Sequence, residues 1–123
     1  MQTPVALLTG GSRGLGAALA SALSTRGWRL VLDGRDTGRL AAAVAALPSP
    51  ELVTAVPGDV ADPAHRAALA AAVGPRLDLL VHNASDLGPS PLVPLADLPP
   101  DRFARLLAVN TICLLYTSDA ADE

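Results

Sequence analysis

The sequence contains no lysine, and several other residue types are scarce. All nine basic residues are arginine, and the single cysteine, Cys113, cannot form a disulfide within the chain. Such cysteine usage is consistent with a reducing compartment. Only 2% of the residues are aromatic, although 50% are hydrophobic. The sequence therefore predicts a core of small aliphatic side chains without disulfide cross-links.

Long apolar runs are absent as well. The first apolar stretch, residues 5–8, is far too short to span a bilayer, and no basic segment leads into a long apolar one. Twelve acidic residues against nine basic ones give a net charge of −3, which disfavours nucleic acids and anionic membranes as partners. We expect a cytoplasmic protein of one domain, because 123 residues support a single modest core.

The sequence is organised around a glycine-rich stretch, residues 9–16, that reads TGGSRGLG. It follows the apolar residues 5–8, which predict a strand, and precedes residues 17–24, which are rich in helix formers. This is the context in which glycines bind nucleotides. We expect Gly14 and Gly16 to let phosphates approach the backbone, where uncapped helix N–H groups favour an anion. Taken alone, the stretch is also compatible with a tight turn that binds nothing.

The rest of the chain alternates strand-like and helix-like segments. The apolar residues of the first helix share one stripe: Leu15, Leu19, Ala22 and Leu23. Further strands are predicted at residues 28–32, 52–56 and 77–81, and further helices at 39–47, at 63–73 and from Asp101 onward. Repeated strand–helix units predict an α/β fold: a Rossmann-type, doubly wound parallel sheet in three layers, incomplete, with strand order 3-2-1-4.

Polar residues follow several of the predicted elements. Asp59 follows the third strand, Asn83 follows the fourth, and Asn110 lies late in the last helix. Each has a structural interpretation when taken singly, since Asp59 and Asn110 can cap turns or helix ends and Asn83 can satisfy loop carbonyls. His65 is expected on the solvent face of its helix, and no cysteine or second histidine lies at metal-ligand spacing. No metal site is predicted.

Four of these features, in this order, resemble the motifs of the classical short-chain dehydrogenase/reductase family. Residues 9–16 match its TGxxxGxG pattern, and Asp59-Val60 match the pair that holds the adenine ring. The segment His82-Asn83-Ala84-Ser85 stands where the family usually carries Asn-Asn-Ala-Gly, and Asn110 matches the asparagine of its catalytic tetrad. The resemblance extends from Val5 to about Ile112 and implies a dinucleotide-dependent oxidoreductase.

The resemblance also implies a set of site residues. The cofactor-binding residues would be Gly10, Ser12, Arg13, Gly14, Leu15, Gly16, Arg35, Asp59, Val60, Asn83 and Ala84. The catalytic residue within the chain would be Asn110, which positions the water that relays a proton. The implied substrate is a small carbonyl or alcohol compound, and the implied full-length protein is a homo-oligomer.

The end of the second predicted strand, Leu32-Asp33-Gly34-Arg35, bears on the choice of cofactor. Folds selective for NAD place a carboxylate there for the ribose 2′-hydroxyl, whereas arginine accommodates a 2′-phosphate. Against the family's pattern, Gly34 falls at the acidic position and Arg35 at the basic one, while strand alternation turns Asp33 to the other face. With Arg13 as a second cation, the sequence favours NADP(H) over NAD(H).

The end of the chain departs from the family. Its catalytic serine and Tyr-x-x-x-Lys pair have no counterpart, because Tyr116 is followed four residues later by Ala120 and lysine is absent. Residues 113–123 instead resemble one reading frame of a transposase-type sequencing adapter. We therefore expect residues 1–112 to be the N-terminal part of a Rossmann domain and residues 113–123 to be a non-native tail.

Two functions follow from this interpretation. The first is an NADP-dependent oxidoreductase for carbonyl and alcohol groups, present here as a truncated and inactive chain. The second is a non-catalytic dinucleotide-binding or regulatory module built on the same half-fold. A parent reading frame that continues into a Tyr-x-x-x-Lys pair would eliminate the second.

Overall fold

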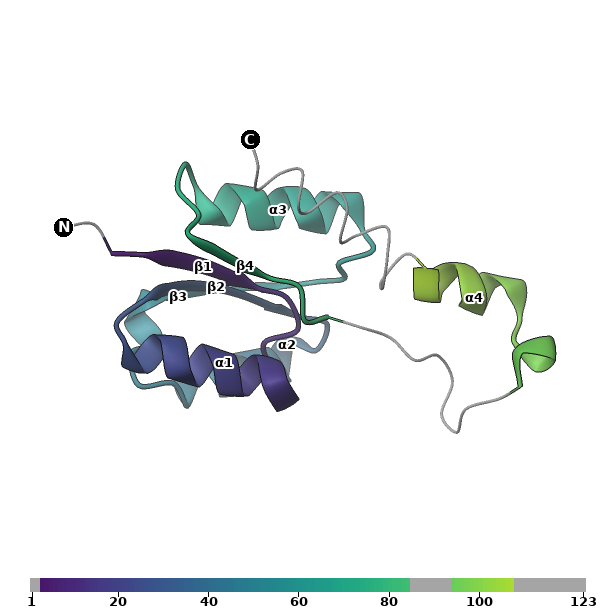
Figure 1. The fold of residues 1–123 in the computed structure, drawn as a ribbon, viewed down its shortest axis with the longest axis horizontal. Helices are drawn as coiled ribbons and strands as arrows, with labels where there is room; N and C mark the ends of the chain where they lie inside the picture. Colours follow the sequence, from purple (N-terminus) through teal and green to yellow (C-terminus); the bar gives the residue numbers. More distant parts are fainter. Residues whose placement is uncertain (1–2, 85–93, 108–123) are drawn as a thin grey trace.

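The computed structural model describes residues 3–84 and 94–107, which form a four-stranded parallel sheet with helices on both faces (Figure 1). In chain order the elements are β1 (Val5–Leu8), α1 (Gly14–Thr25), β2 (Arg29–Gly34), α2 (Thr37–Ala45), the 3₁₀ turn η1 (Pro50–Leu52), β3 (Val53–Pro57), α3 (Pro63–Val73), β4 (Leu79–Val81), the 3₁₀ turn η2 (Leu95–Asp97) and α4 (Pro100–Leu107). The strand order is β3-β2-β1-β4, and all neighbours are parallel. The predicted fold class and strand order are confirmed.

The sheet separates two hydrophobic cores, because side chains alternate between its faces along each strand. Ala6 and Leu8 of β1 belong to the core that includes residues of α1 and α2. Val5 and Leu7 belong to the other core, which includes Leu69 of α3. Figure 1 shows α1 and α2 on one side of the sheet and α3 on the other. Burial on both faces explains why β1 is apolar throughout.

Helix α1 meets the sheet through small residues rather than through the predicted stripe. Its buried positions recur every four residues: Gly16, Ala20 and Ser24. Leu19 and Leu23 pack against the margin of the core, whereas Ala22 is exposed and Leu15 is 67% exposed. The prediction was wrong for Leu15 and Ala22, because small residues every fourth position bring the helix backbone close to the sheet.

The helix boundaries follow capping signals and differ from the predictions in several places. Gly27 follows α1 with φ of +80°, and the Asp62 carboxylate accepts the Ala64 N–H at 3.0 Å to cap α3, with proline at the first helical position, a combination typical of a helix start. Helix α2 begins earlier than predicted because Asp36 caps it. Helix α4 begins before Asp101, because the Pro99 carbonyl accepts the first amide bonds of the helix.

Strand β4 is shorter than predicted, and within the described part of the chain it pairs only with β1. Leu79 of β4 is 36% exposed. An edge position leaves one side of the strand without a neighbouring strand to limit solvent access.

Among the described residues, no helix combines the length and the apolar character that a membrane span requires.

Candidate functional site

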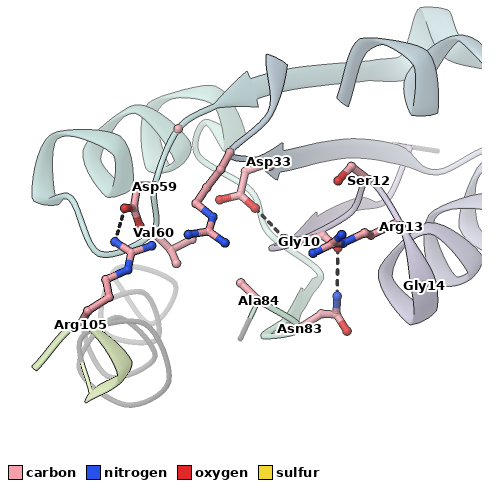
Figure 2. A pocket seen from close by; sticks show the side chains of 13 residues that line it. Gly10, Ser12, Arg13, Gly14, Asp33, Asp59, Val60, Asn83, Ala84 and Arg105 are labelled. Carbon is pink, nitrogen blue, oxygen red and sulfur yellow. Dashed lines mark hydrogen bonds and ion pairs between the residues drawn. The ribbon is translucent and has the colours of Figure 1, made fainter. Parts of the chain in front are cut away.

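The carboxyl ends of all four strands meet at a cavity of about 320 Å³, which lies at the lower end of the range for ligand pockets. Figure 2 shows the side chains that surround it. The lining residues are Gly10, Ser12, Arg13, Gly14, Asp33, Gly34, Arg35, Gly58, Asp59, Val60, Asn83, Ala84 and Arg105. Ligands in open α/β sheets bind at this edge, where the strand order reverses on either side of β1.

The glycine-rich turn between β1 and α1 is shaped to leave its backbone accessible. Gly10 and Gly14 have φ of +70° and +60°, in a backbone region that residues with a side chain rarely adopt. A Cβ on Gly14 would meet no atom within 4 Å, so the space beside this residue is open. The N-cap of α1, Arg13, makes no side-chain cap hydrogen bond. The first N–H groups of α1 are therefore available to an anion in the cavity.

Two of the expected cofactor residues, Leu15 and Gly16, do not line this cavity. Gly16 is buried, and a Cβ on it would lie 2.6 Å from Asn83 Nδ2 and closer still to the Gly10 carbonyl oxygen. The approach of a phosphate to the backbone of Gly16 stays a prediction. The lack of a side chain at Gly16 lets α1 pack directly against the turn, which is the packing role of the last glycine in this pattern.

The loop after β4 is held to the glycine-rich turn by three hydrogen bonds. The Thr9 hydroxyl oxygen accepts the N–H groups of Asn83 and Ala84, both at 3.1 Å. Asn83 Nδ2 donates to the Gly10 carbonyl oxygen at 3.0 Å (Figure 2). Asn83 thus satisfies a loop carbonyl, one of the two interpretations open from the sequence, and it does so on the wall of the cavity.

Asp33, at the end of β2, lines the cavity and contacts α3. Its Oδ1 accepts the Gly10 N–H at 2.7 Å, and its Oδ2 lies 2.8 Å from His65 Nε2. Burial raises the pKa of Asp33, while the hydrogen bonds from His65 and Gly10 act in the opposite direction. Val31, two residues earlier, packs in the core with α3, so the alternation predicted for β2 holds and turns Asp33 toward His65.

His65 is 6% exposed, so the expectation of a solvent-facing histidine was wrong. The spacing of residues along α3 could have predicted the burial of His65. His65, Leu69 and Val73 are the buried residues of α3, and they recur every four positions on one stripe. His65 continues that stripe to the carboxyl edge of the sheet, where it meets Asp33.

Asp59 lies at the end of the cavity away from the glycine-rich turn, where it is paired with Arg105 of α4 (Figure 2). Its other oxygen accepts the Ala61 N–H at 2.9 Å. Burial alone would raise the pKa of Asp59, but the hydrogen bonds from Arg105 and Ala61 and the charges of Arg105 and Arg35 outweigh it and lower the pKa. Asp59 and Val60 both line the cavity, as their place in the sequence suggested.

Three arginines from three different elements line the same cavity: Arg13, Arg35 and Arg105. Sequence reasoning singled out the first two and missed Arg105, which reaches the cavity only through tertiary packing of α4. It also left Gly34 and Gly58 out of the expected site, although Gly34 is the last residue of β2 and Gly58 directly follows β3, positions that were a usable signal. Asn110, Ser85 and residues 113–123 lie outside the described residues.

The described residues that line the cavity carry groups suited to binding a ligand. They offer uncapped N–H groups, cationic guanidinium groups and an amide on one cavity wall. Within residues 3–84 and 94–107, no three histidine, cysteine, aspartate or glutamate side chains gather as metal ligands. Together, the 3-2-1-4 parallel sheet and the glycine turn at its carboxyl edge define a Rossmann-type α/β domain.

A family model described as short chain dehydrogenase matches residues 4–122, so the chain belongs to this family of oxidoreductases. A Streptomyces violaceoruber protein, provisionally named ketoacyl reductase 2 of the granaticin polyketide synthase, is 34% identical over 127 residues, covering 98% of this chain and 49% of its own. The 3-oxoacyl-(acyl-carrier-protein) reductase of rhamnolipid biosynthesis from Pseudomonas aeruginosa is 39% identical over 83 residues, covering 65% of this chain and 32% of its own.

Among solved structures, a short-chain dehydrogenase from Sphingobium yanoikuyae in complex with NADPH superposes with a TM-score of 0.84. It is 32% identical, and the match covers 96% of this chain and 47% of the other. The chain thus spans about half the length of the first relatives that it matches.

Proposed function

We propose that this chain provides the NADP(H)-binding part of an oxidoreductase that interconverts a carbonyl and an alcohol group. The observation that carries the proposal is the position of Arg13 and Arg35, which follow different strands and line one cavity beside the glycine turn. Arginine accommodates the 2′-phosphate that distinguishes NADP from NAD. Two guanidinium groups within reach of a dianionic phosphate make strong charge-assisted contacts.

The residues present fit a dinucleotide. The open space beside Gly14 and the uncapped start of α1 suit a pyrophosphate, which a side chain at Gly14 would obstruct. The other proposed contacts come from residues that line the cavity: Gly10, Ser12, Asp59, Val60, Asn83 and Ala84. Leu15 and Gly16 remain proposed contacts through their backbone in the first turn of α1. When bound, the cofactor supplies the hydride, and these residues hold and orient it.

The related proteins support the proposal. The Sphingobium yanoikuyae structure contains NADPH, and the Streptomyces and Pseudomonas relatives are named as ketoacyl and 3-oxoacyl reductases. By this analogy the substrate is a small carbonyl or alcohol compound, Asn110 positions a proton-relaying water, and the full-length protein is a cytoplasmic homo-oligomer. The division into a Rossmann part, residues 1–112, and a non-native tail, residues 113–123, belongs to the same proposal.

A second candidate is a dinucleotide-binding module without turnover. It is supported by the described lining of the cavity, which offers N–H, guanidinium and amide groups suited to binding. This candidate keeps the same cavity and the same ligand.

Calorimetric titration of the purified chain with NADPH and NADH tests the shared part of both candidates. We expect NADPH to bind more tightly, and equal affinities would refute the NADP assignment. Following NADPH absorbance in the presence of ketones then separates the candidates. We expect no turnover by this chain and turnover by the protein encoded at the complete locus, whereas a complete protein that binds NADPH without turnover would support the module.

A further inference from the structure

Asp33 and His65 form a buried pair at the cavity that the proposed binding function does not use. Their side chains are only 2% and 4% exposed, and His65 Nε2 lies 2.8 Å from Asp33 Oδ2. The other oxygen, Oδ1, accepts the Gly10 N–H at 2.7 Å. Both carboxylate oxygens of Asp33 are therefore engaged by groups of the protein itself.

The imidazole ring of His65 is fixed in place by its surroundings. A Cβ on Gly58 would lie 2.8 Å from two carbons of the ring, so the ring rests directly on the turn after β3. Asp62 caps the first turn of α3, to which His65 belongs. The ring therefore has little freedom to leave Asp33 without displacing either α3 or this turn.

The position of Asp33 gives this pair a consequence for ligand choice. Asp33 lines the same cavity as Arg13 and Arg35, and it directly precedes Gly34, the position at which an acid selects for the ribose 2′-hydroxyl of NAD. A carboxylate beside that position, with an oxygen turned toward the ribose, would accept from the 2′-hydroxyl and repel a 2′-phosphate. Asp33 does not turn Oδ2 toward the ribose while His65 holds that oxygen.

We propose that His65 is a specificity-determining residue: by holding Asp33 Oδ2, it withdraws the acid from the ribose and leaves the arginines to select a 2′-phosphate. This inference rests on the proposed function. His65 is a positioning residue, since it acts through Asp33 and does not line the cavity itself.

The test compares two substitutions of His65 that introduce side-chain amides of different length. In His65→Gln the side-chain nitrogen takes the place of Nε2 and keeps a donor for Asp33, whereas in His65→Asn the amide is too short to reach it. The probes are adenosine 2′,5′-bisphosphate and 5′-AMP, and calorimetry gives the ratio of their affinities. We expect His65→Asn to lower the preference for the bisphosphate about tenfold and His65→Gln to keep it within about twofold.

Two further variants connect the effect to the charge of Asp33. Asp33→Asn combined with His65→Asn should restore the preference, because the released charge is then absent. A double variant that keeps the lowered preference would overturn the inference, as would an unchanged preference in folded His65→Asn. Asp33→Asn alone should change the preference by no more than about twofold, and a tenfold rise would show that Asp33 already opposes the 2′-phosphate in the wild-type protein.

The inference and the proposed function fail in different ways. A wild-type chain that binds neither probe, or binds both equally, would refute the proposed function. A wild-type chain that prefers the bisphosphate, with His65→Asn and His65→Gln retaining the same preference, would refute only the role of His65. Thermal unfolding of each variant confirms that the compared proteins are folded.

Discussion

The two sides of the cavity are built in different ways. On the β1–β4 side, the walls apart from Arg13 are backbone and short side chains in close contact, as where Asn83 bonds the Gly10 carbonyl and α1 packs on the turn through Gly16. On the β2–β3 side, long charged side chains reach into the cavity, and Arg35 is exposed while Arg105 is partly exposed. The β1–β4 side fixes the positions of backbone groups, whereas the β2–β3 side supplies charged side chains to the cavity.

This difference separates two tasks. Close backbone packing fixes the positions of N–H groups, which suits a pyrophosphate that all dinucleotides share. Flexible arginines do not fix a backbone geometry, but they distinguish a 2′-phosphate from a hydroxyl. Substitutions on the β1–β4 side should therefore affect folding and all ligands together, whereas substitutions on the β2–β3 side should change which ligand is preferred.

The largest effect is expected for Gly16→Ala. The new methyl group would lie 2.6 Å from Asn83 Nδ2 and closer to the Gly10 carbonyl oxygen, which is backbone and cannot move away cheaply. We expect a loss of about 3 kcal/mol in the free energy of unfolding, at the upper end of overpacking costs, and no measurable binding of NADPH or NADH. Urea unfolding and calorimetry measure the two quantities.

Gly38→Ala is the matched control, because Gly38 also lies in the first turn of a helix. A Cβ there would meet only Asp36 Oδ1, at an ordinary contact distance of 3.6 Å. We expect a gain of about 0.5–1 kcal/mol from better helix propensity. If Gly16→Ala behaved like Gly38→Ala, the β1–β4 side would not be the rigid side of the cavity.

The next effect in size is expected for Arg35→Asp. One lost charged hydrogen bond corresponds to about a ten- to hundredfold lower affinity for NADPH, while NADH binding should change little. Arg39→Asp makes the same charge change at an exposed position that does not line the cavity. A NADPH/NADH affinity ratio that falls equally in both variants would mean that general charge, and not Arg35, sets the preference.

Patterns of neighbouring residues predicted those features of the fold that depend on residues close together in the sequence. The glycine turn, the strand order and the Asp62 cap follow from contiguous residues and from the rules of parallel sheets, and the structure contains them. The cavity residues that follow each strand were found in the same way, because strand ends in a doubly wound sheet meet at one edge. Asp59 and Asn83 are examples.

Contacts between distant elements were not predictable from such patterns. The pairing of Asp33 with His65 depends on how α3 crosses the sheet, and the pairing of Asp59 with Arg105 depends on where α4 packs. The packing of Gly16 was not predictable either, because only the structure shows that a Cβ there would meet Asn83. Chain distances of 32 and 46 residues separate the members of the two charged pairs.

The smallest effect is expected where the β2–β3 side contributes to stability, at the Asp59–Arg105 pair. Asp59 has a pKa below its ordinary value of 3.8, so the pair stabilises the fold above that pH, and the contribution is lost as the pH falls through the lowered pKa. Both side chains are partly exposed, at 35% and 26%, and screening therefore limits the contribution to below about 1 kcal/mol. Arg105→Ala should cost this amount at about pH 7 and less at about pH 3, below the ordinary pKa of 3.8, whereas Arg102→Ala, an exposed arginine on the same helix, should cost little at either pH. Urea unfolding at both pH values measures the difference. A cost for Arg105→Ala that persisted in acid would show that Arg105 stabilises the fold by packing and not by pairing with the Asp59 carboxylate, and the contrast between a packed side and a charged side of the cavity would then fail at α4.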